Sequence, residues 1–136
     1  MEGGDFQAAL GELHEALTVF VNGDAEPIKR LHSKRSDLTA FYGWGGYQKG
    51  YEAIAGRWDW ALPGFHGGEV TYETLSTVEG TELAFAMEIE TFSVVFGEDK
   101  QSRTWKNNVT HVFVREDGAW RLLHRHASQQ PDAPSK

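Results

Sequence analysis

Histidines that could transfer protons are concentrated near the end of the chain, where His111, His124 and His126 are three of the six in the sequence. His124 and His126 lie two residues apart in a run typical of a β-strand, so their side chains are expected on one side, about 6.5–7 Å apart. Trp120 and Leu122 are expected on that side as well. An apolar wall carrying two imidazoles, which titrate near neutral pH, is typical of a pocket with acid–base groups. We therefore predict that His124 or His126 acts as the general acid or base; the alternative is hydrogen bonding between strands or a place in a subunit interface.

The side on which His111 lies depends on the turn that joins its strand to the last one. The Asp-Gly pair at 117–118 separates two runs of β-branched and aromatic residues, which is the strongest short-range signal for a hairpin. A two-residue loop would place His111 beside His124. A three-residue loop with a bulge would place Thr110 and Asn108 there instead, and the sequence leaves both registers open.

Aromatic residues are abundant for a chain of 136 residues and supply further candidates for a binding site. Trp44 and Trp58 could close over a flat organic ligand, with packing in the core as the alternative for Trp58. Tyr42 or Asn108 could donate a hydrogen bond to a ligand oxygen. The residues that we predict to contact a ligand are Tyr42, Trp44, Trp58, Asn108, Thr110, His111 and Trp120.

Two carboxylates, Glu88 and Glu90, alternate with apolar residues on one predicted strand. They share a strand face with Ala84 and Ala86, which indicates a solvated outer face or a contact between subunits. A carboxylate at the floor of the pocket is the alternative.

The composition limits the classes of function. A net charge of −7 disfavours nucleic acid and anionic membranes as partners, because binding phosphate needs a basic surface. The chain has no cysteine, so disulfides, thiolate nucleophiles and thiolate metal sites are excluded. We expect neither a metal nor a cofactor. The N-terminus lacks an apolar signal region and no run reaches the ~18 apolar residues of a membrane span, so a cytoplasmic location is expected.

Hydrophobic periodicity predicts helices first and strands afterwards, which is typical of an α+β fold. Helices are expected over 5–21, 24–32 and 47–61, with a short strand over 38–42. Four long antiparallel strands are expected over 67–79, 83–96, 103–116 and 119–128, and a bulge after Thr91 would explain a change of apolar parity in the second of these. We predict a single domain over 1–136, with its core at 5–128 and a flexible tail at 129–136.

This order of elements, the Asn-Gly-Asp junction at 22–24 and the segment Trp-Arg-Leu-Leu-His-Arg-His-Ala-Ser at 120–128 resemble the NTF2-like superfamily. Within it, the chain is similar to SnoaL-like and ketosteroid-isomerase-like small proteins. The resemblance implies a cone-shaped, cystatin-like α+β barrel in which three N-terminal helices pack on a strongly curved antiparallel sheet. It also implies a deep pocket without a metal, and frequent homodimers formed through the sheet. It does not fix the chemistry, because one fold serves many functions.

The resemblance also allows the isomerase residues to be sought in this chain. The Tyr on the first helix and the base Asp at the end of the first strand would fall on Ala16 and Tyr42. Neither can perform the family role at neutral pH, so steroid isomerisation by that mechanism is not expected. We predict a pocket that binds a small hydrophobic, oxygenated organic molecule, with cofactor-free isomerisation, dehydration or cyclisation as its reaction if it is an enzyme. The alternative is a non-catalytic homodimeric association or ligand-sensing module.

Overall fold

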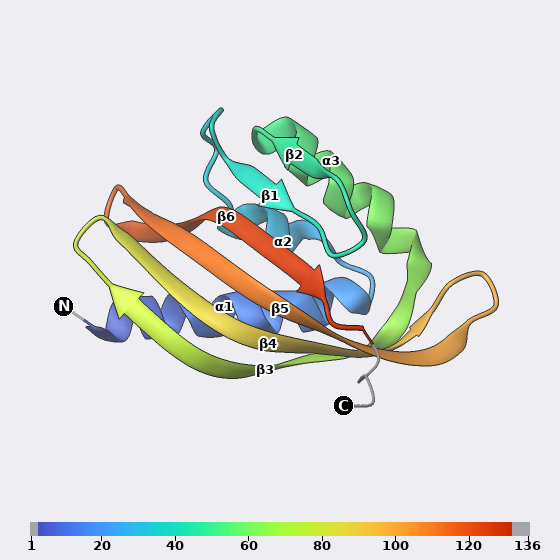
Figure 1. Ribbon diagram of the computed structural model, residues 1–136. Helices are drawn as coiled ribbons and strands as arrows, with labels where there is room; N and C mark the ends of the chain where they lie inside the picture. Colours follow the sequence, from blue (N-terminus) through green and yellow to red (C-terminus); the bar gives the residue numbers. More distant parts are fainter. Residues whose placement is uncertain (1–2, 132–136) are drawn as a thin grey trace.

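The computed structural model describes residues 3–131 and consists of helices packed on a curved, open sheet (Figure 1). Its helices are α1 (Gly3–Val21), α2 (Glu26–Leu31) and α3 (Tyr51–Ala61), and a 3₁₀ turn follows at Leu62–Gly64. Its strands are β1 (Thr39–Phe41), β2 (Tyr47–Lys49), β3 (Phe65–Glu79), β4 (Leu83–Phe96), β5 (Gln101–Glu116) and β6 (Ala119–Gln129). The strand order is β2-β1-β6-β5-β4-β3, and β1 with β6 is a parallel pair. No helix within residues 3–131 has the length and apolar character that crossing a membrane requires.

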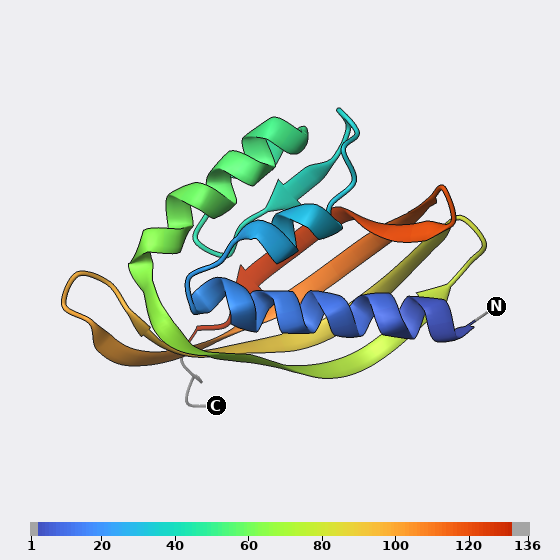
Figure 2. The same cartoon turned by 180° about the vertical axis from the view of Figure 1, so that it is seen from behind.

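Helix α1 lies along one face of the sheet, and the view from behind shows it in front of the long strands (Figure 2). Its buried residues recur every three or four positions, as expected of a helix with one apolar stripe. They are Phe6, Leu10, Leu13, Ala16, Leu17, Phe20 and Val21. We call the face of the sheet that α1 covers the inner face. The opposite, outer face carries no helix in Figure 1.

The predicted start of the third helix is wrong, because 47–49 forms strand β2 rather than helix. β2 pairs antiparallel with β1, with Phe41 opposite Tyr47. The chain reverses through Gly45 and Gly46, whose φ values of 101° and 82° are readily adopted only by glycine. Tyr47, although it lies at helical spacing from Tyr51, therefore belongs to a hairpin whose turn contains the two glycines.

The bulge predicted after Thr91 is also absent. β4 pairs with β5 without a register shift along its whole length, so one set of alternate residues faces inward throughout. That buried set is Ala84, Ala86, Glu88, Glu90, Phe92 and Val94. The expectation that Glu88 and Glu90 lie on an outer face or subunit contact is thus wrong. The large apolar residues switch from one set of alternate positions to the other along β4 for a different reason. The first half of the strand has apolar side chains on its outer face, while its inner face there carries two carboxylates.

The last hairpin has the two-residue loop, with Glu116 opposite Ala119. Asp117 and Gly118 both have positive φ, 51° and 80°, as a tight hairpin turn requires. A register shift follows, because Phe113 pairs with Leu122 whereas the adjacent Val112 pairs with His124. Leu123 is therefore the extra residue of a β-bulge.

This bulge reverses the faces expected for the histidines. Trp120 and Leu122 point inward and are buried, whereas His124 and His126 lie opposite Val112 and Thr110 on the outer face. The predicted apolar wall shared by Trp120, Leu122 and both histidines is consequently wrong. A one-residue insertion in a strand moves every following side chain to the other face.

Candidate functional site

A cavity of about 80 Å³ lies at the end of the sheet where α3 and the β1–β2 hairpin approach the inner face. Strands β3, β4, β5 and β6 and the turn between β1 and β2 contribute to it, together with α1 and α3. Its aromatic walls are Phe20, Tyr42, Trp44, Trp58, Phe65, Phe92 and Trp105. Its polar lining residues are Arg57, Asn107 and Arg125. It is therefore an apolar hollow with a few polar groups, which is the usual character of a ligand site.

The aromatic walls are held by contacts between rings from separate elements. Phe20 of α1 meets Trp58 of α3 edge-on, with the ring centroids 4.9 Å apart. Phe92 and Trp105 of neighbouring strands are stacked at 5.0 Å. Such pairs contribute about 0.5–1.5 kcal/mol beyond the area that they bury, so this wall is preformed.

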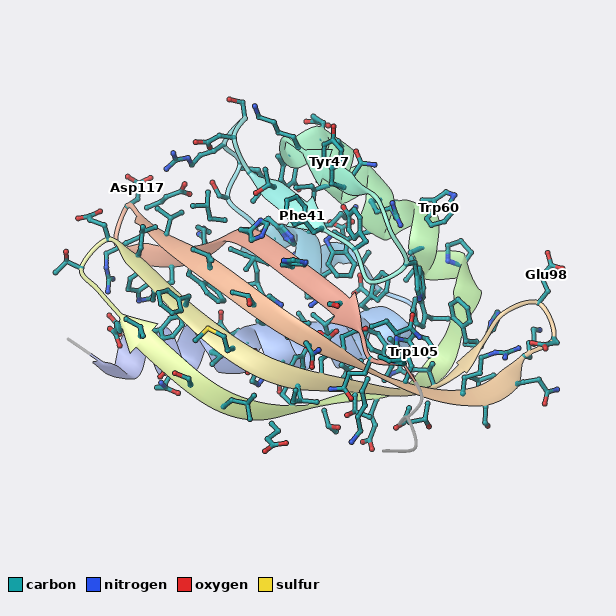
Figure 3. All side chains as sticks on the ribbon, viewed as in Figure 1. Phe41, Tyr47, Trp60, Glu98, Trp105 and Asp117 are labelled. Carbon is teal, nitrogen blue, oxygen red and sulfur yellow. The ribbon has the colours of Figure 1, made fainter. Side chains whose placement is uncertain are left out.

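Trp44 is different, because it lies at the mouth of the cavity on the hairpin turn and is 48% exposed. Its ring contacts Phe65, Phe96 and Trp105, at centroid distances of 6.5, 5.6 and 6.0 Å. Figure 3 shows Trp105 toward the part of the sheet that leads to Glu98, away from Asp117. The mouth of the cavity is thus far from the last hairpin turn.

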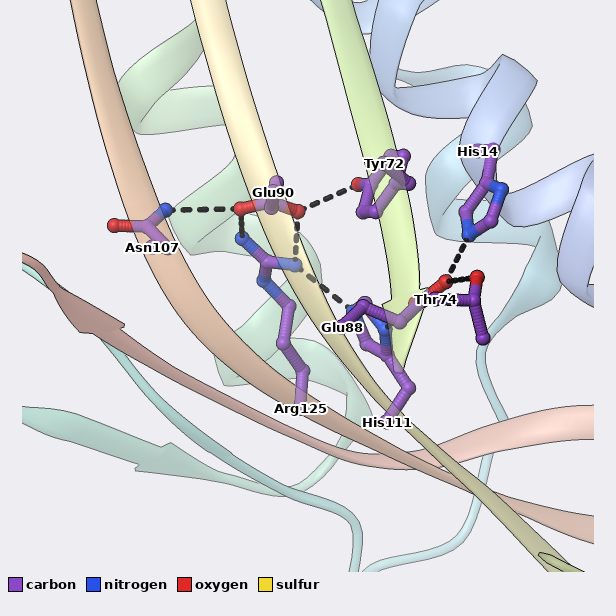
Figure 4. Close-up of polar contacts among 8 residues, drawn as sticks. All are labelled: His14, Tyr72, Thr74, Glu88, Glu90, Asn107, His111 and Arg125. Carbon is purple, nitrogen blue, oxygen red and sulfur yellow. Dashed lines mark hydrogen bonds and ion pairs between the residues drawn. The ribbon is translucent and has the colours of Figure 1, made fainter. Parts of the chain in front are cut away.

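Arg125, a lining residue of the cavity, forms an ion pair with Glu90, and Figure 4 shows the contacts around this pair. Arg125 donates from Nη1 to Glu90 Oε2 and from Nη2 to Glu90 Oε1, both at 2.8 Å. Tyr72 donates its hydroxyl to Glu90 Oε2, and Asn107 donates Nδ2–H to Oε1 at 2.9 Å. Four donor contacts therefore satisfy one buried carboxylate, which is the condition for burying a charge without a large penalty.

The network continues from Arg125 away from the cavity. Nη1 of Arg125 lies 2.9 Å from Nε2 of His111, and Nδ1 of His111 lies 3.2 Å from Oε1 of Glu88. Since a guanidinium only donates, His111 must accept at Nε2 and carry its proton on Nδ1. Glu88 Oε2 also meets Nε2 of His14 at 2.6 Å and accepts from the hydroxyl of Thr74 at 2.7 Å.

The protonation states of the network follow from these contacts. Burial raises the pKa of the Glu90 carboxyl, but attraction and hydrogen bonds from Arg125 outweigh it, and the pKa falls to about 2. For Glu88, hydrogen bonds from His111 and His14 overcome burial and lower the pKa to about 2. Burial lowers the pKa of His111, partly opposed by its hydrogen bond to Glu88. Both carboxylates are ionised at neutral pH and are therefore weak bases.

A second buried histidine, His32, braces the wall behind Trp58. Nδ1 of His32 lies 2.8 Å from the carbonyl oxygen of Ile28, so its Nε2 is left to accept from the indole N–H of Trp58 at 3.4 Å. Burial lowers the pKa of His32 to about 4, although its hydrogen bond to Ile28 opposes the shift. The imidazole is therefore neutral at pH 7 and fixes the orientation of Trp58.

Tyr42 supplies a buried polar atom that lacks a partner. Its hydroxyl is inaccessible to water and has no hydrogen-bond partner among the described residues. Burial raises the pKa of the phenol, so it stays protonated and is a donor at neutral pH. An unpaired buried donor costs about 1–3 kcal/mol, which a ligand oxygen could recover.

The structure separates the predicted site residues into groups. Tyr42, Trp44 and Trp58 line the cavity together. His111 belongs to the polar network behind the cavity. Trp120 does not line the cavity; it is buried in the core, where its ring packs against Phe6.

The remaining predicted residues lie on the outer face. His126, Asn108 and Thr110 line a shallow groove there with Leu75 and Met87. His124 Nδ1 lies 2.7 Å from the hydroxyl oxygen of Thr39. The catalytic roles of the two outer histidines stay predictions, and the geometry of the cavity gives them no support.

Arg57, Asn107 and Arg125 were not predicted from the sequence as lining residues. An inward position for Glu90, at the floor of the pocket, was considered only as an alternative. Arg125 lies between the two conspicuous histidines, and only the bulge at Leu123 turns it inward. One signal for the inward position of Glu90 was present in the sequence. Uninterrupted alternation along β4 places Glu90 on the same face as Ala84 and Ala86, which are buried.

Comparisons with known proteins agree with this architecture. The model of a family described as the SnoaL-like domain matches residues 7–133. No curated protein shows a significant match to the chain.

Solved structures with the same fold share little sequence with this chain. A ketosteroid isomerase-like protein from Erwinia carotovora atroseptica has a TM-score of 0.78 at 14% identity, covering 96% of each chain. An NTF2-like superfamily protein from Salmonella enterica has a TM-score of 0.72 at 16% identity, covering 95% of this chain and 96% of that one. A protein with a cystatin-like fold from Caulobacter vibrioides has a TM-score of 0.74 at 18% identity, covering 96% and 92%. The predicted α+β fold is confirmed, with a cone-like sheet that does not close.

Proposed function

Since the chain belongs to the SnoaL-like domain family, we propose that its cavity binds a small organic molecule with an apolar body and at least one oxygen atom. The observation that carries this proposal is the convergence of an aromatic wall with polar groups at one end. Trp58 and Phe65 offer apolar surface, while Asn107 and Arg125 line the same hollow. Tyr42 adds a donor that has no partner within residues 3–131.

The side chains of the lining favour binding over proton transfer. Its titratable members among the described residues are Tyr42, Arg57 and Arg125, and neither a carboxylate nor an imidazole reaches the cavity. A protonated phenol and two guanidinium groups can polarise a carbonyl oxygen, but they cannot remove a proton at neutral pH. The side chains that line the cavity therefore support ligand binding or sensing without a chemical step better than they support catalysis.

The dimensions of the cavity limit the ligand. Sites for drug-sized molecules have about 300–1,000 Å³, whereas this cavity has about 80 Å³. A ligand must therefore be small, or the exposed ring of Trp44 must move outward to admit it. The glycines on either side of Trp44 in the β1–β2 hairpin leave the turn without neighbouring side chains that would resist such a movement.

We expect small aromatic or alicyclic fragments with one oxygen-bearing group to shift the indole N–H signals of Trp44, Trp58 and Trp105 in ¹H–¹⁵N NMR spectra. These indoles belong to the walls of the cavity, so their chemical shifts report on a ligand there. Trp120 is the internal control, because it packs against Phe6 outside the cavity. Single Trp→Phe variants assign the signals.

The outcome of this titration is decisive for the proposal. Saturable shifts of the cavity indoles, with the Trp120 signal unmoved, would support it. Fragments that bind only at outer-face residues, or a fragment set of several hundred members with no saturable shift at the cavity, would overturn it.

A second candidate function, self-association through the outer face, is favoured by apolar side chains on that face. Phe41 is 42% exposed and Leu75 58% exposed, and Leu75 lines a groove of this face together with Met87 and Ile89. Exposed apolar patches of this kind commonly mark interfaces. This candidate is compatible with a ligand in the cavity, because the two sites lie on opposite faces of the sheet.

We expect the chain to sediment as a homodimer, and Ile89→Arg to shift it to the monomer mass of 15.2 kDa. A buried, unpaired cation at the centre of an interface is strongly unfavourable. Glu52→Arg on the exposed side of α3 is the control for the added charge and should leave the mass unchanged. A wild-type chain that is monomeric at 100 μM would contradict this candidate.

A further inference from the structure

Arg57 of α3 presents an unusual cation at the cavity. Its Cζ atom lies 4.1 Å from the centroid of the Tyr42 ring and 4.9 Å from that of Trp60. Stacking of this kind fixes the plane of a guanidinium while leaving its N–H groups, which lie in that plane, free to donate. Arg57 is thus held in place by aromatic faces rather than by hydrogen bonds.

The charge of Arg57 is not balanced within the part of the chain that the structure describes. Arg35, Arg103 and Arg125 each contact a carboxylate through their guanidinium nitrogens. No carboxylate among residues 5–131 lies within ion-pair distance of Arg57, although the chain has 20 acidic residues. The cavity therefore carries one positive charge without a counter-charge, since Glu90 neutralises Arg125.

The two arginines of the cavity consequently have different capacities. Arg125 uses Nη1 and Nη2 for Glu90 and His111, so it is poorly placed to receive a ligand anion. Within the part of the chain that the structure describes, Arg57 has its donors unused, and the adjacent Tyr42 hydroxyl is a donor without a partner. Planar, two-pronged donation to a carboxylate is the contact that a guanidinium makes best.

We propose that the ligand of this cavity is a small monocarboxylate whose carboxylate pairs with Arg57 and whose apolar body lies against Trp58 and Phe65. This inference rests on the proposed function, because it names the class of molecule that the same cavity takes. Tyr42 contributes its hydroxyl to a carboxylate oxygen. The cavity volume of about 80 Å³ limits the body to a few carbon atoms or one ring.

The test compares acids with amides of the same shape. The probes are isobutyrate with isobutyramide, and benzoate with benzamide, each titrated while the indole signals of the cavity are followed at low ionic strength. We expect each acid to bind at least 10-fold more tightly than its amide. Raising the salt concentration should weaken the acids and leave the amides unaffected, because screening acts on the charge alone.

Variants then assign the preference to one side chain. Arg57→Met should reduce the ratio of acid to amide affinity to about one, and Arg57→Lys should retain part of it, which separates loss of charge from loss of packing. Arg30→Met is the matched control, because Arg30 is an exposed arginine of α2 outside the cavity, and the ratio should be unchanged.

The failure of this inference is distinguishable from that of the proposed function. Equal binding of acids and amides, or an acid preference that survives Arg57→Met, would overturn the carboxylate assignment and leave the cavity as a binding site for neutral molecules. If neither probe pair binds while other fragments occupy the cavity, the assignment is also overturned. If no fragment occupies the cavity, both proposals fall.

Discussion

Replacing Arg125 with methionine is expected to lower the free energy of unfolding by about 3–5 kcal/mol, because it leaves the buried Glu90 carboxylate without its counter-charge. Glu90 is fully buried and Arg125 is 7% exposed, so water cannot replace the lost partner without opening the core. His111 would lose the donor to its Nε2 in the same change. Urea unfolding followed by tryptophan fluorescence measures the effect.

Two further variants show whether this cost comes from the pair. In the double variant Glu90→Gln with Arg125→Met, the carboxylate charge is gone as well, so the loss should be smaller than the sum of the single losses. Arg103→Met is the surface control, because its exposed pair with Asp99 is worth at most about 1 kcal/mol. A loss under 1 kcal/mol for Arg125→Met would contradict the described role of this pair.

Stability is expected to fall in two stages as the pH is lowered. In the first stage, from about 6.5 to about 4, the unfolded chain binds a proton at His32 that the folded chain excludes, because burial lowers the folded pKa to about 4. In the second, from about 4.5 to about 2, unfolding is favoured by proton uptake at Glu88 and Glu90, whose folded pKa values are about 2. Each of these groups contributes about 3 kcal/mol over its window, since one pKa unit corresponds to about 1.4 kcal/mol.

Substitutions should reduce each stage separately. His32→Asn, whose amide N–H can replace the bond to Ile28, should reduce the dependence between pH 6.5 and 4 without abolishing it, because burial also lowers the pKa of His111. Glu90→Gln should reduce the dependence below pH 4.5 while lowering stability at pH 7. Urea unfolding at half-unit pH intervals provides the curves, and identical slopes for wild type and both variants would contradict the assignments.

The sequence predicted the order of helices and long strands because their apolar residues repeat with the periods of those elements. The stripe Phe6–Leu10–Leu13–Leu17 is buried at helical spacing, as expected. The two-residue loop at 117–118 also follows from its residues, because glycine accepts the positive φ that the turn requires.

Two features explain why the predicted faces of the strands were wrong. The bulge at Leu123 inserts one residue between Leu122 and His124, and no residue type there demands it. Along β4, apolar side chains lie on the outer face while Glu88 and Glu90 lie inside, which reverses the usual rule.

The candidate site was predicted only in part for the same reason. Tyr42, Trp44 and Trp58 reach the cavity, whereas His124 and His126 lie on the other face of the sheet. A buried carboxylate is tolerated because Arg125 pairs with it, and that pairing joins two residues that are 35 positions apart in sequence. Spacing along one strand does not indicate such a partner.

A crystal structure of the chain soaked with the most tightly binding fragment would test the central claim most directly. We predict density for the fragment between Trp58 and Phe65, with its oxygen toward Arg57 or Tyr42 and the ring of Trp44 displaced if the fragment is larger than the cavity. Density confined to the outer face at His124 or His126, with the cavity closed by its own side chains, would contradict it.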